Sequence, residues 1–370
     1  MKIKVLQENL AGALTHLQKA IPGKPQLPIL ASVHIKVTDT VCQLSATDLY
    51  FGVRCRVQSD VTEEGELVVP GKEFKEIISS LPAGPLELSF SESTLLIKSA
   101  HSKAKLQCMS SEDYPEFPES EGTAYQLSAG QLEAVTQHIL FSASTDQARP
   151  VLTAVLFSVS PEGSRTVATD GFRLAVLELP GFSSESEARN FLIPSKALSE
   201  VARIQKQTQE EIVAFSVSDE LKQAFFSVAD VEVFVRLIEG EYPPYQKIIP
   251  SNFTTTVLFD TAELQENIKR ATIFAREASN IVKFNFHPEK TGISATAPTI
   301  GEFKGELSQA KVEGEEAMIA FNAKYLLDFL QSTSADTLWF GMSESLKPAL
   351  FRPEGQEDYQ YIVMPFKVTE

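Results

Sequence analysis

The sequence predicts an α+β fold made of three tandem copies of one unit, in which two helices pack on an antiparallel sheet. The first observation is a repeated pair of blocks. Leu27-Pro-Ile-Leu30 and Ala46-Thr-Asp48 return as Arg149-Pro-Val-Leu152 and Ala168-Thr-Asp170, and the offset is 122 residues for both blocks. A chain that repeats one unit in this way is more typical of a ring, an arc or a scaffold than of an enzyme with a single site.

A second repeated block supports three domains of similar size. Leu67-Val-Val-Pro-Gly-Lys-Glu-Phe74 returns as Leu192-Ile-Pro-Ser-Lys-Ala-Leu198, with a looser third copy over 319–326. Each third of the chain is long enough to bury its own core. We therefore expect three domains, called here the first, second and third repeat: 1–125, 126–253 and 254–370.

Each repeat opens with a short strand and an amphipathic helix. Apolar residues near helical spacing indicate these helices. They are Leu6, Leu10, Leu14 and Leu17 in the first repeat, Leu132, Val135, Ile139 and Leu140 in the second, and Leu264, Ile268 and Ile273 in the third. Ser128 and Asp260 stand where N-caps of the later two helices are expected, with Gln131 and Glu263 three residues on.

Short runs rich in Val, Ile, Phe and Thr follow, with the two-residue alternation of strands. They are Val33–Val37, Val53–Val57, Thr94–Lys98, Leu152–Val159, Phe225–Val228, Val231–Val235, Val282–Phe286 and Leu338–Gly341. In the middle of each repeat a strand leads into a second helix, expected near 73–80, 197–204 and 323–331. Pro70 and Pro194 suit the first turn of two of these helices, because a proline there leaves no N–H unpaired.

Composition indicates a globular protein and excludes several classes. The chain is 43% hydrophobic and 22% charged, and no run approaches the ~20 apolar residues of a membrane helix. The N-terminal segment lacks the apolar core of a signal peptide, so a cytoplasmic location is expected. The net charge of −16 opposes nucleic-acid binding unless the basic residues gather on one surface.

The cysteines and histidines do not suggest a metal or a cofactor. Cys42, Cys55 and Cys108 all lie in the first repeat, and we interpret them as free thiols in strands. No Cys-x-x-Cys pair occurs, and the five histidines have no metal-ligand spacing.

Lys72, Lys196 and Lys324 hold the same place in the first turn of the second helix of each repeat. A cation there opposes the helix dipole, whereas contact with a phosphate would reverse the penalty. The lysines therefore either form part of a basic surface for a phosphate backbone, extended by Arg203 and Lys206, or are copies of one surface lysine without a role.

The densest polar cluster is Thr169-Asp-Gly-Phe-Arg-Leu174. Asp170 and Arg173 could be an acid–base or substrate-clamping pair of an enzyme. Alternatively the segment is a strand–turn–strand corner, as its copy Ala46-Thr-Asp48 suggests. Because no nucleophile elbow, phosphate-binding loop, dinucleotide motif or two-metal carboxylate cluster occurs, we expect no catalytic residues.

Taken in order, these blocks resemble the bacterial sliding clamp family, the beta subunits of the replicative DNA polymerase. The residues that carry the resemblance are Leu27–Leu30, Arg149–Leu152, Val167–Ala175, Glu239–Tyr245 with Ile249-Pro250, Phe321–Asp328 and Val363–Phe366. The family implies three tandem copies of a DNA-clamp unit per chain and a head-to-tail homodimer closed into a ring of six domains. It also implies a non-catalytic processivity factor for DNA replication, in which an acidic exterior is compatible with a basic bore.

The resemblance implies partners and three sites. The partners are duplex DNA bound without sequence preference, the replicative DNA polymerase alpha subunit, the clamp loader and other proteins with the clamp-binding motif. A partner-peptide pocket between the second and third domains should involve Leu152, Thr169, Gly171, Phe172, Arg173, Leu174, Pro243, Lys247, Ile248, Asn322, Tyr325, Leu346, Pro348, Ile362, Met364, Pro365 and Phe366. DNA contacts should come from Lys24, Lys72, Arg149, Lys196, Arg203 and Lys324. The subunit interface should bring Ile273 and Phe274 against Leu106 and Cys108 of the other chain.

The chain departs from some family members at three places in these sites. Phe172 stands where some have His, Phe366 where some have Met, and Pro150-Val151 where some have aromatic residues that touch DNA.

Two other functions remain open from the residues alone. The chain could be a three-domain protein-interaction module that keeps the peptide groove and never meets nucleic acid. It could also be an enzyme that uses Asp170 and Arg173, or Cys108 as a nucleophile.

Overall fold

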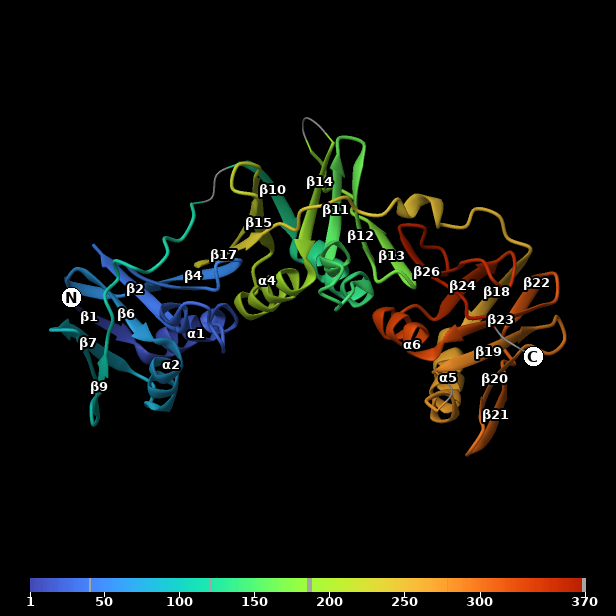
Figure 1. Cartoon of the computed structure of the whole chain (residues 1–370), viewed down its shortest axis with the longest axis horizontal. Coiled ribbons are helices and arrows are strands. Elements are labelled where there is room, and N and C mark those ends of the chain that lie inside the picture. The colour runs from blue at the N-terminus through green and yellow to red at the C-terminus, as the bar shows by residue number, and fades with distance from the viewer. Residues whose placement is uncertain (40, 120–121, 185–187, 278, 368–370) are drawn as a thin grey trace. The chain divides into compact units, whose positions relative to one another are not determined.

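The computed structural model describes residues 1–39, 41–119, 122–184, 188–277 and 279–367. The chain forms two compact units: unit 1 is Met1–Gly130 with Lys196–Leu237, and unit 2 is Gln131–Ser195 with Ile238–Glu370. The second repeat is therefore divided between the units. Figure 1 labels the helices and strands of both.

Within the described residues each repeat contributes two α-helices, as the sequence predicted. They are α1 Gln7–Leu17, α2 Gly71–Ser80, α3 Ala129–His138, α4 Ser195–Thr208, α5 Thr261–Ala275 and α6 Ala323–Ser332. In Figure 1, α1 lies beside α2 and α5 lies beside α6.

Unit 1 holds two antiparallel sheets. One has the strand order β5-β1-β7-β8-β9, and the other has the order β10-β15-β16-β17-β4-β3-β2-β6. The strands are β1 Lys2–Leu6, β2 Ser32–Thr38, β3 Val41–Thr47, β4 Phe51–Gln58, β5 Asp60–Glu63, β6 Gly65–Pro70, β7 Pro85–Ser91, β8 Thr94–Lys98, β9 Lys103–Gln107, β10 Thr123–Ser128, β15 Ile212–Ser218, β16 Gln223–Val228 and β17 Val231–Arg236.

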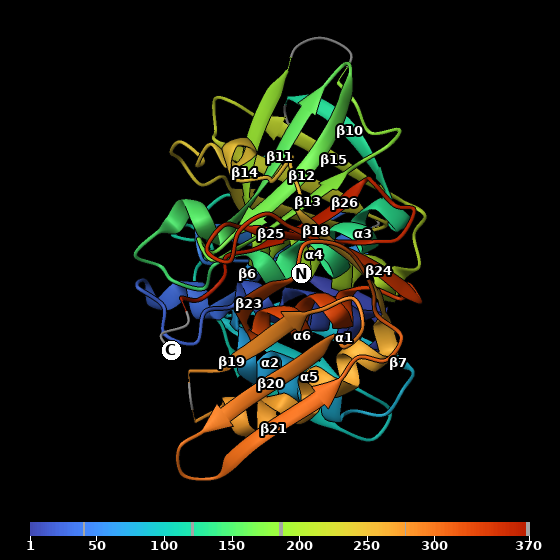
Figure 2. The same cartoon turned by 90° about the vertical axis from the view of Figure 1, so that its right-hand side faces the viewer.

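Unit 2 also holds two antiparallel sheets, with the orders β14-β11-β12-β13-β26-β25-β24-β18-β22 and β21-β20-β19-β23. Figure 2 shows β11 to β13 side by side in the first of these sheets and β19 to β21 side by side in the second. The strands are β11 Ala154–Ser160, β12 Gly163–Thr169, β13 Arg173–Glu178, β14 Arg189–Pro194, β18 Thr255–Asp260, β19 Ile281–Phe286, β20 Gly292–Ala297, β21 Gly301–Glu306, β22 Lys311–Gly314, β23 Ala317–Asn322, β24 Thr337–Met342, β25 Ala349–Pro353 and β26 Tyr359–Val363.

The largest sheet of each unit is shared by two repeats. In unit 1, β4 of the first repeat pairs with β17 of the second, and Gly52 lies opposite Phe234. In unit 2, β13 of the second repeat pairs with β26 of the third, and Leu174 lies opposite Ile362. These strand pairs define two junctions between neighbouring repeats, one inside each unit.

The helices bury one apolar face against these sheets, as their spacing predicted. Leu10, Leu14 and Leu17 of α1 are buried, as are Leu264 and Ile268 of α5. One predicted helix position is wrong, because Leu6 ends β1 instead of starting α1 and is 48% exposed. Ile273 lies in α5 as predicted but is 60% exposed, so it is not on the buried face of the helix.

The helix starts differ slightly from the prediction. Asp260 caps α5, because its Oδ1 accepts a hydrogen bond of 2.7 Å from the Glu263 N–H, as expected. Pro70 is the residue before α2, and Pro194 ends β14. Both prolines therefore precede the first helical turn and do not lie in it.

The cysteines are free thiols, as predicted, and Cys42 and Cys55 lie in β3 and β4, but Cys108 follows β9 and does not lie in a strand. Burial raises the pKa of Cys42 and of Cys55 to about 12, and it also raises the pKa of the half-buried Cys108. In the part of the chain that the structure describes, no group of three or more His, Cys, Asp or Glu side chains could hold a metal ion. No helix there combines the length and apolar character needed to cross a membrane.

Candidate functional site

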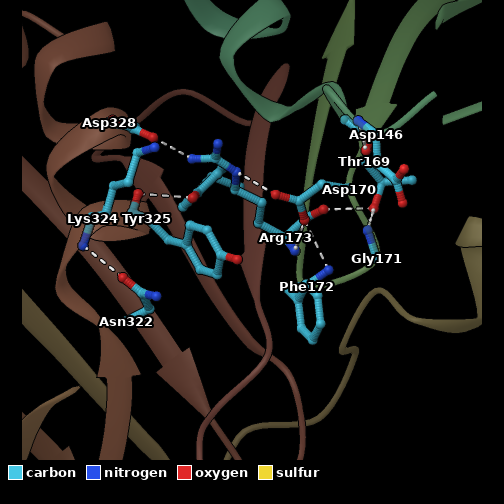
Figure 3. A network of polar contacts seen from close by, with 12 residues as sticks. Asp146, Thr169, Asp170, Gly171, Phe172, Arg173, Asn322, Lys324, Tyr325 and Asp328 are labelled. Carbon is cyan, nitrogen blue, oxygen red and sulfur yellow. Dashed lines mark hydrogen bonds and ion pairs between the residues drawn. The ribbon is translucent and has the colours of Figure 1, made fainter. Parts of the chain in front are cut away.

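The polar cluster of the second repeat is a strand–turn–strand corner between β12 and β13 (Figure 3). Thr169 Oγ1 donates to the Arg173 carbonyl at 2.6 Å and accepts from the Gly171 N–H at 3.0 Å. Asp170 Oδ1 accepts from the Phe172 and Arg173 N–H groups at 2.9 and 3.0 Å. Gly171 has a φ of +93°, which suits glycine. The structural interpretation of this corner is therefore confirmed.

The Arg173 side chain contacts two carboxylates and two aromatic rings. Its side chain is 8% exposed, its Nε lies 3.0 Å from Asp170 Oδ2, and its Nη1 lies 2.6 Å from Asp328 Oδ2 on α6. Its guanidinium also lies over two aromatic rings, 4.7 Å from the centre of Tyr325 and 5.5 Å from that of Phe141. Because two carboxylates share this charge, Asp170 and Arg173 are not a free acid–base pair.

An apolar floor lies beneath the corner. Leu174 and Ile362 pair across β13 and β26, and both belong to a buried cluster with Tyr245 and Leu350. Tyr245 begins the short helix Tyr245–Lys247, which anchors the predicted pocket residues Pro243, Lys247 and Ile248 to this cluster. Leu152, on the turn Pro150–Thr153, is 8% exposed.

The rim of the site contains exposed apolar side chains. Phe172 is 52% exposed, and its ring stacks on Tyr325 with the centres 6.5 Å apart. The Met364 N–H donates to the Phe172 carbonyl at 2.8 Å, and the Phe366 N–H donates to Ala320 at 2.8 Å. These bonds hold the C-terminal segment, including Pro365, beside the corner.

The remaining predicted pocket residues lie on two other segments. Asn322 caps α6, because its Oδ1 accepts from the Lys324 N–H at 2.9 Å. Leu346, which is 56% exposed, and Pro348 lie on the loop between β24 and β25. The structure thus brings together the corner, the start of α6 and the C-terminal segment. Sequence reasoning did not find Asp328 or Phe141 as parts of this site, because their contacts with Arg173 join separate segments of the chain.

The predicted DNA-contact residues fall into two groups. Lys72, Lys196 and Lys324 are each the second residue of a helix and are exposed, and Lys24 is exposed too. Arg149 and Arg203 are instead engaged by acidic neighbours. Arg149 Nε lies 3.4 Å from Asp146, and Arg203 Nε lies 2.7 Å from Glu200. Their role toward DNA stays a prediction.

The predicted interface residues lie beside two sheet edges. Leu106 is in β9, the edge strand of the five-stranded sheet, and Cys108 follows it. Ile273 and Phe274 are in the last turn of α5, and Phe274 stacks on Phe303 of the edge strand β21 at 6.4 Å. Edge strands carry unpaired N–H and C=O groups that another chain can pair with.

Comparison with known protein families decides the family. Three family models match the chain: the N-terminal domain of the DNA polymerase III beta subunit over residues 1–118, its central domain over 126–244, and its C-terminal domain over 246–367. The chain belongs to the DNA polymerase III beta subunit family.

Relatives in this family match over nearly the whole chain. It is 31% identical to the "Beta sliding clamp" of Staphylococcus epidermidis and to that of Staphylococcus aureus, and the match covers 99% of each chain. Among solved structures, the DNA polymerase III beta subunit of Thermotoga maritima is 29% identical with a TM-score of 0.91. The DNA polymerase sliding clamp of Bacillus subtilis is 26% identical with a TM-score of 0.94. Both structures match over 100% of each chain.

Proposed function

We propose that this protein is a DNA sliding clamp, a processivity factor that encircles duplex DNA and tethers the replicative polymerase. The observation that carries this function is the match to all three beta-subunit domains, in order, over almost the whole chain. Like its family, the protein performs no catalysis of its own. Asp170 is used by the backbone of its corner, and burial raises the pKa of the Cys108 thiol above its usual range.

The corner site is the proposed docking place for the clamp-binding motif of the polymerase alpha subunit, the clamp loader and other partners. Phe172 offers an exposed ring to a short apolar peptide, and Leu174, Ile362 and Tyr245 form the buried apolar core that supports the corner. Met364 lies beside Phe172 and offers a side chain that adapts to irregular ligands.

DNA would be held by enclosure and by weak contacts with phosphates. Lys72, Lys196 and Lys324 repeat at the start of α2, α4 and α6, so each internal copy presents one cation in the same helical position. Such contacts carry no sequence information, which suits a protein that must slide. The net charge of −16 is compatible with this, provided that acidic residues predominate elsewhere on the surface.

The homodimer would form head to tail through two sheet edges. Leu106 and Cys108 beside β9 would meet Ile273 and Phe274 beside β21 of the other chain. Ile273 is 60% exposed, so its side chain is accessible to the other chain, as this assignment requires. We place the protein in the cytoplasm, with domains at 1–125, 126–253 and 254–370.

The deciding experiment combines native mass with retention on DNA. The protein is loaded by the clamp loader onto nicked circular DNA and, in parallel, onto the same DNA after linearisation. A clamp should have about twice the 40.7 kDa chain mass and should stay on the circle but slide off the linear form. The variant in which Lys72, Lys196 and Lys324 are all alanine should form the same dimer, with a smaller dependence of DNA binding on salt.

Equal loss from circular and linear DNA would contradict the enclosure. It would favour the interaction module that keeps the peptide site and never meets nucleic acid. A monomer in the native mass measurement would contradict the assigned edges.

A further inference from the structure

We propose that Asp328 is a positioning residue of the peptide site, which holds the Phe172 corner against α6 through Arg173. This inference rests on the proposed function, because it assigns a role in binding the partner peptide to a residue outside the predicted pocket. Asp328 Oδ2 lies 2.6 Å from Arg173 Nη1, and its side chain is 25% exposed.

Two residues of α6 hold the same guanidinium. Tyr325 and Asp328 are three positions apart, so they lie on one face of the helix. Asp328 binds the edge of the guanidinium, and Tyr325 lies under its plane at 4.7 Å (Figure 3). Asp170 binds the same group from the corner itself at 3.0 Å. Arg173 therefore ties β13 of the second repeat to α6 of the third.

The position of the exposed Phe172 ring depends on the contacts of Arg173 with α6. Phe172 precedes Arg173 and stacks on Tyr325, and its carbonyl accepts the Met364 N–H. If Arg173 moved away from α6, Phe172 would lose its place on Tyr325. The exposed ring and the adjacent C-terminal segment would then no longer form one surface.

The other junction shows that the backbone does not need this ion pair. The corner Thr47–Phe51 of unit 1 is the copy of Thr169–Arg173, and there Phe51 takes the place of Arg173. On α4, 128 residues before Asp328, stands Glu200. Glu200 pairs with Arg203 of its own helix at 2.7 Å. A corner and a neighbouring helix thus form without the tie at this junction, so the pair serves something specific to the second junction.

Removal of Asp328 should act mainly on the position of Arg173. The Arg173 side chain is 8% exposed, and without Asp328 its buried guanidinium would keep only Asp170 as an ionic partner. A charge left partly unpaired in a buried place favours rearrangement toward solvent.

The test measures peptide binding by the full chain and two variants. The probe is a fluorescein-labelled peptide that spans the clamp-binding motif of the replicative polymerase alpha subunit of the same organism. Asp328→Asn should raise the Kd for this peptide about five- to twentyfold, the range of an indirect coupling between residues. Glu200→Gln, the matched change at the other junction, should leave the Kd unchanged. Asp328→Glu, which keeps the carboxylate, should restore most of the affinity.

A second measurement reports the environment of the residue at position 172 when no peptide is bound. With 4-fluorophenylalanine at position 172, the ¹⁹F resonance should move toward a solvent-exposed shift in Asp328→Asn and should not change in Glu200→Gln. A general loss of stability would instead lower the unfolding midpoint without this specific shift.

The possible failures are distinct. If the unaltered chain does not bind the peptide, the proposed pocket is wrong. If the unaltered chain binds but Asp328→Asn binds equally well with an unchanged ¹⁹F resonance, the positioning role is wrong. If Asp328→Asn does not fold, Asp328→Glu decides, because a folded glutamate variant that loses affinity twentyfold would also overturn the role of the carboxylate.

Discussion

The corners at the two junctions, one in each unit, have the same hydrogen bonds. In unit 1, Thr47 Oγ1 donates to the Phe51 carbonyl at 3.0 Å and accepts from the Leu49 N–H at 2.9 Å. Asp48 Oδ1 accepts from the Tyr50 and Phe51 N–H groups at 2.9 and 2.7 Å. Thr169 and Asp170 make the same bonds in unit 2.

The match extends to the neighbouring strand and connector. The Arg236 N–H donates to the Tyr50 carbonyl at 2.7 Å, as the Met364 N–H does to Phe172. Tyr114 and Tyr242 hold the connectors in the same way, since their hydroxyls bond the backbone carbonyls of Ser45 and Val167 at 3.5 and 3.4 Å. Ser45 and Val167 are again 122 residues apart.

The side chains around the two corners differ. Gly52 stands where unit 2 has Leu174, and Phe234 stands where it has Ile362. The Phe234 ring lies over Gly52, and Phe117 packs edge-on against that ring at 5.0 Å. The first junction therefore fills its floor with its own aromatic rings. The comparison teaches that the repeat determines the backbone of both corners, while a few side chains determine which ligand each junction can bind.

The largest effect on stability is expected when Gly52 is replaced by leucine, the residue type found at the matching position, Leu174, of unit 2. A Cβ at Gly52 would lie 2.1 Å from Phe234 Cε1, and Phe234 is itself 3% exposed. Gly52→Leu should therefore lower the free energy of unfolding by about 3 kcal/mol or more, because an overpacked core must shift. Urea denaturation measures this change. Unchanged stability would mean that Phe234 can leave its place freely, and the contrast between the floors would then be lost.

The next effect concerns the two exposed rings. Tyr50 is 60% exposed and Phe172 is 52% exposed, at matching positions. Phe172→Ala should weaken binding of the labelled polymerase peptide about thirtyfold, as expected for an aromatic anchor. Tyr50→Ala is the matched control and should bind like the unaltered chain. An equal loss in both variants would show that both junctions bind the peptide.

A smaller effect is expected at the turn residue of each corner. Leu49 and Gly171 both have positive φ values, +78° and +93°. Gly171→Ala should cost about 1 kcal/mol of folding stability, because an L side chain is strained there and its Cβ would lie 3.2 Å from Arg149 Nη1. Leu49→Gly should not destabilise the chain. Thermal unfolding compares the two, and a stable Gly171→Ala variant would contradict the strain at this position.

The smallest effect is a dependence on pH that both junctions share. His16 and His138 are 122 residues apart, and the Nδ1 of each is buried without a hydrogen-bond partner among the described residues. Burial lowers the pKa of both below the ordinary 6.5; the Arg203 charge adds to this at His16, where Glu200 opposes it, and Asp358 opposes it at His138. The folded chain keeps both rings neutral where the unfolded chain is protonated, so stability should fall as pH drops below 6.5.

Urea midpoints at neutral and mildly acidic pH test this dependence. His16→Gln and His138→Gln should each reduce the fall, and the double variant should reduce it further. A midpoint of the unaltered chain that does not change over this range would contradict the prediction.

The sequence predicted what is local or copied and missed what is distant. The corner, the Asp260 cap and the place of the three lysines follow from short motifs and from the repeat. The pairing of β4 with β17 could not be predicted, because it joins strands far apart in the chain and no short motif marks it. Asp328 was missed for the same reason, since it lies 155 residues from Arg173.

The sharing of each large sheet by two repeats affects how the chain is made. As the ribosome releases the first repeat, β4 stays an open edge until β17 has been synthesised, because β17 is its partner. Arg56 on this strand reaches its acceptor, Glu232, only then, with a contact of 2.6 Å, whereas Arg54 contacts Glu119 of the first repeat at 3.1 Å as well as Glu232 at 2.8 Å. Until β17 is made, the charge of Arg56 should discourage the nascent strand from pairing with another chain. The same arginine would thus protect the edge during synthesis and bind β17 afterwards.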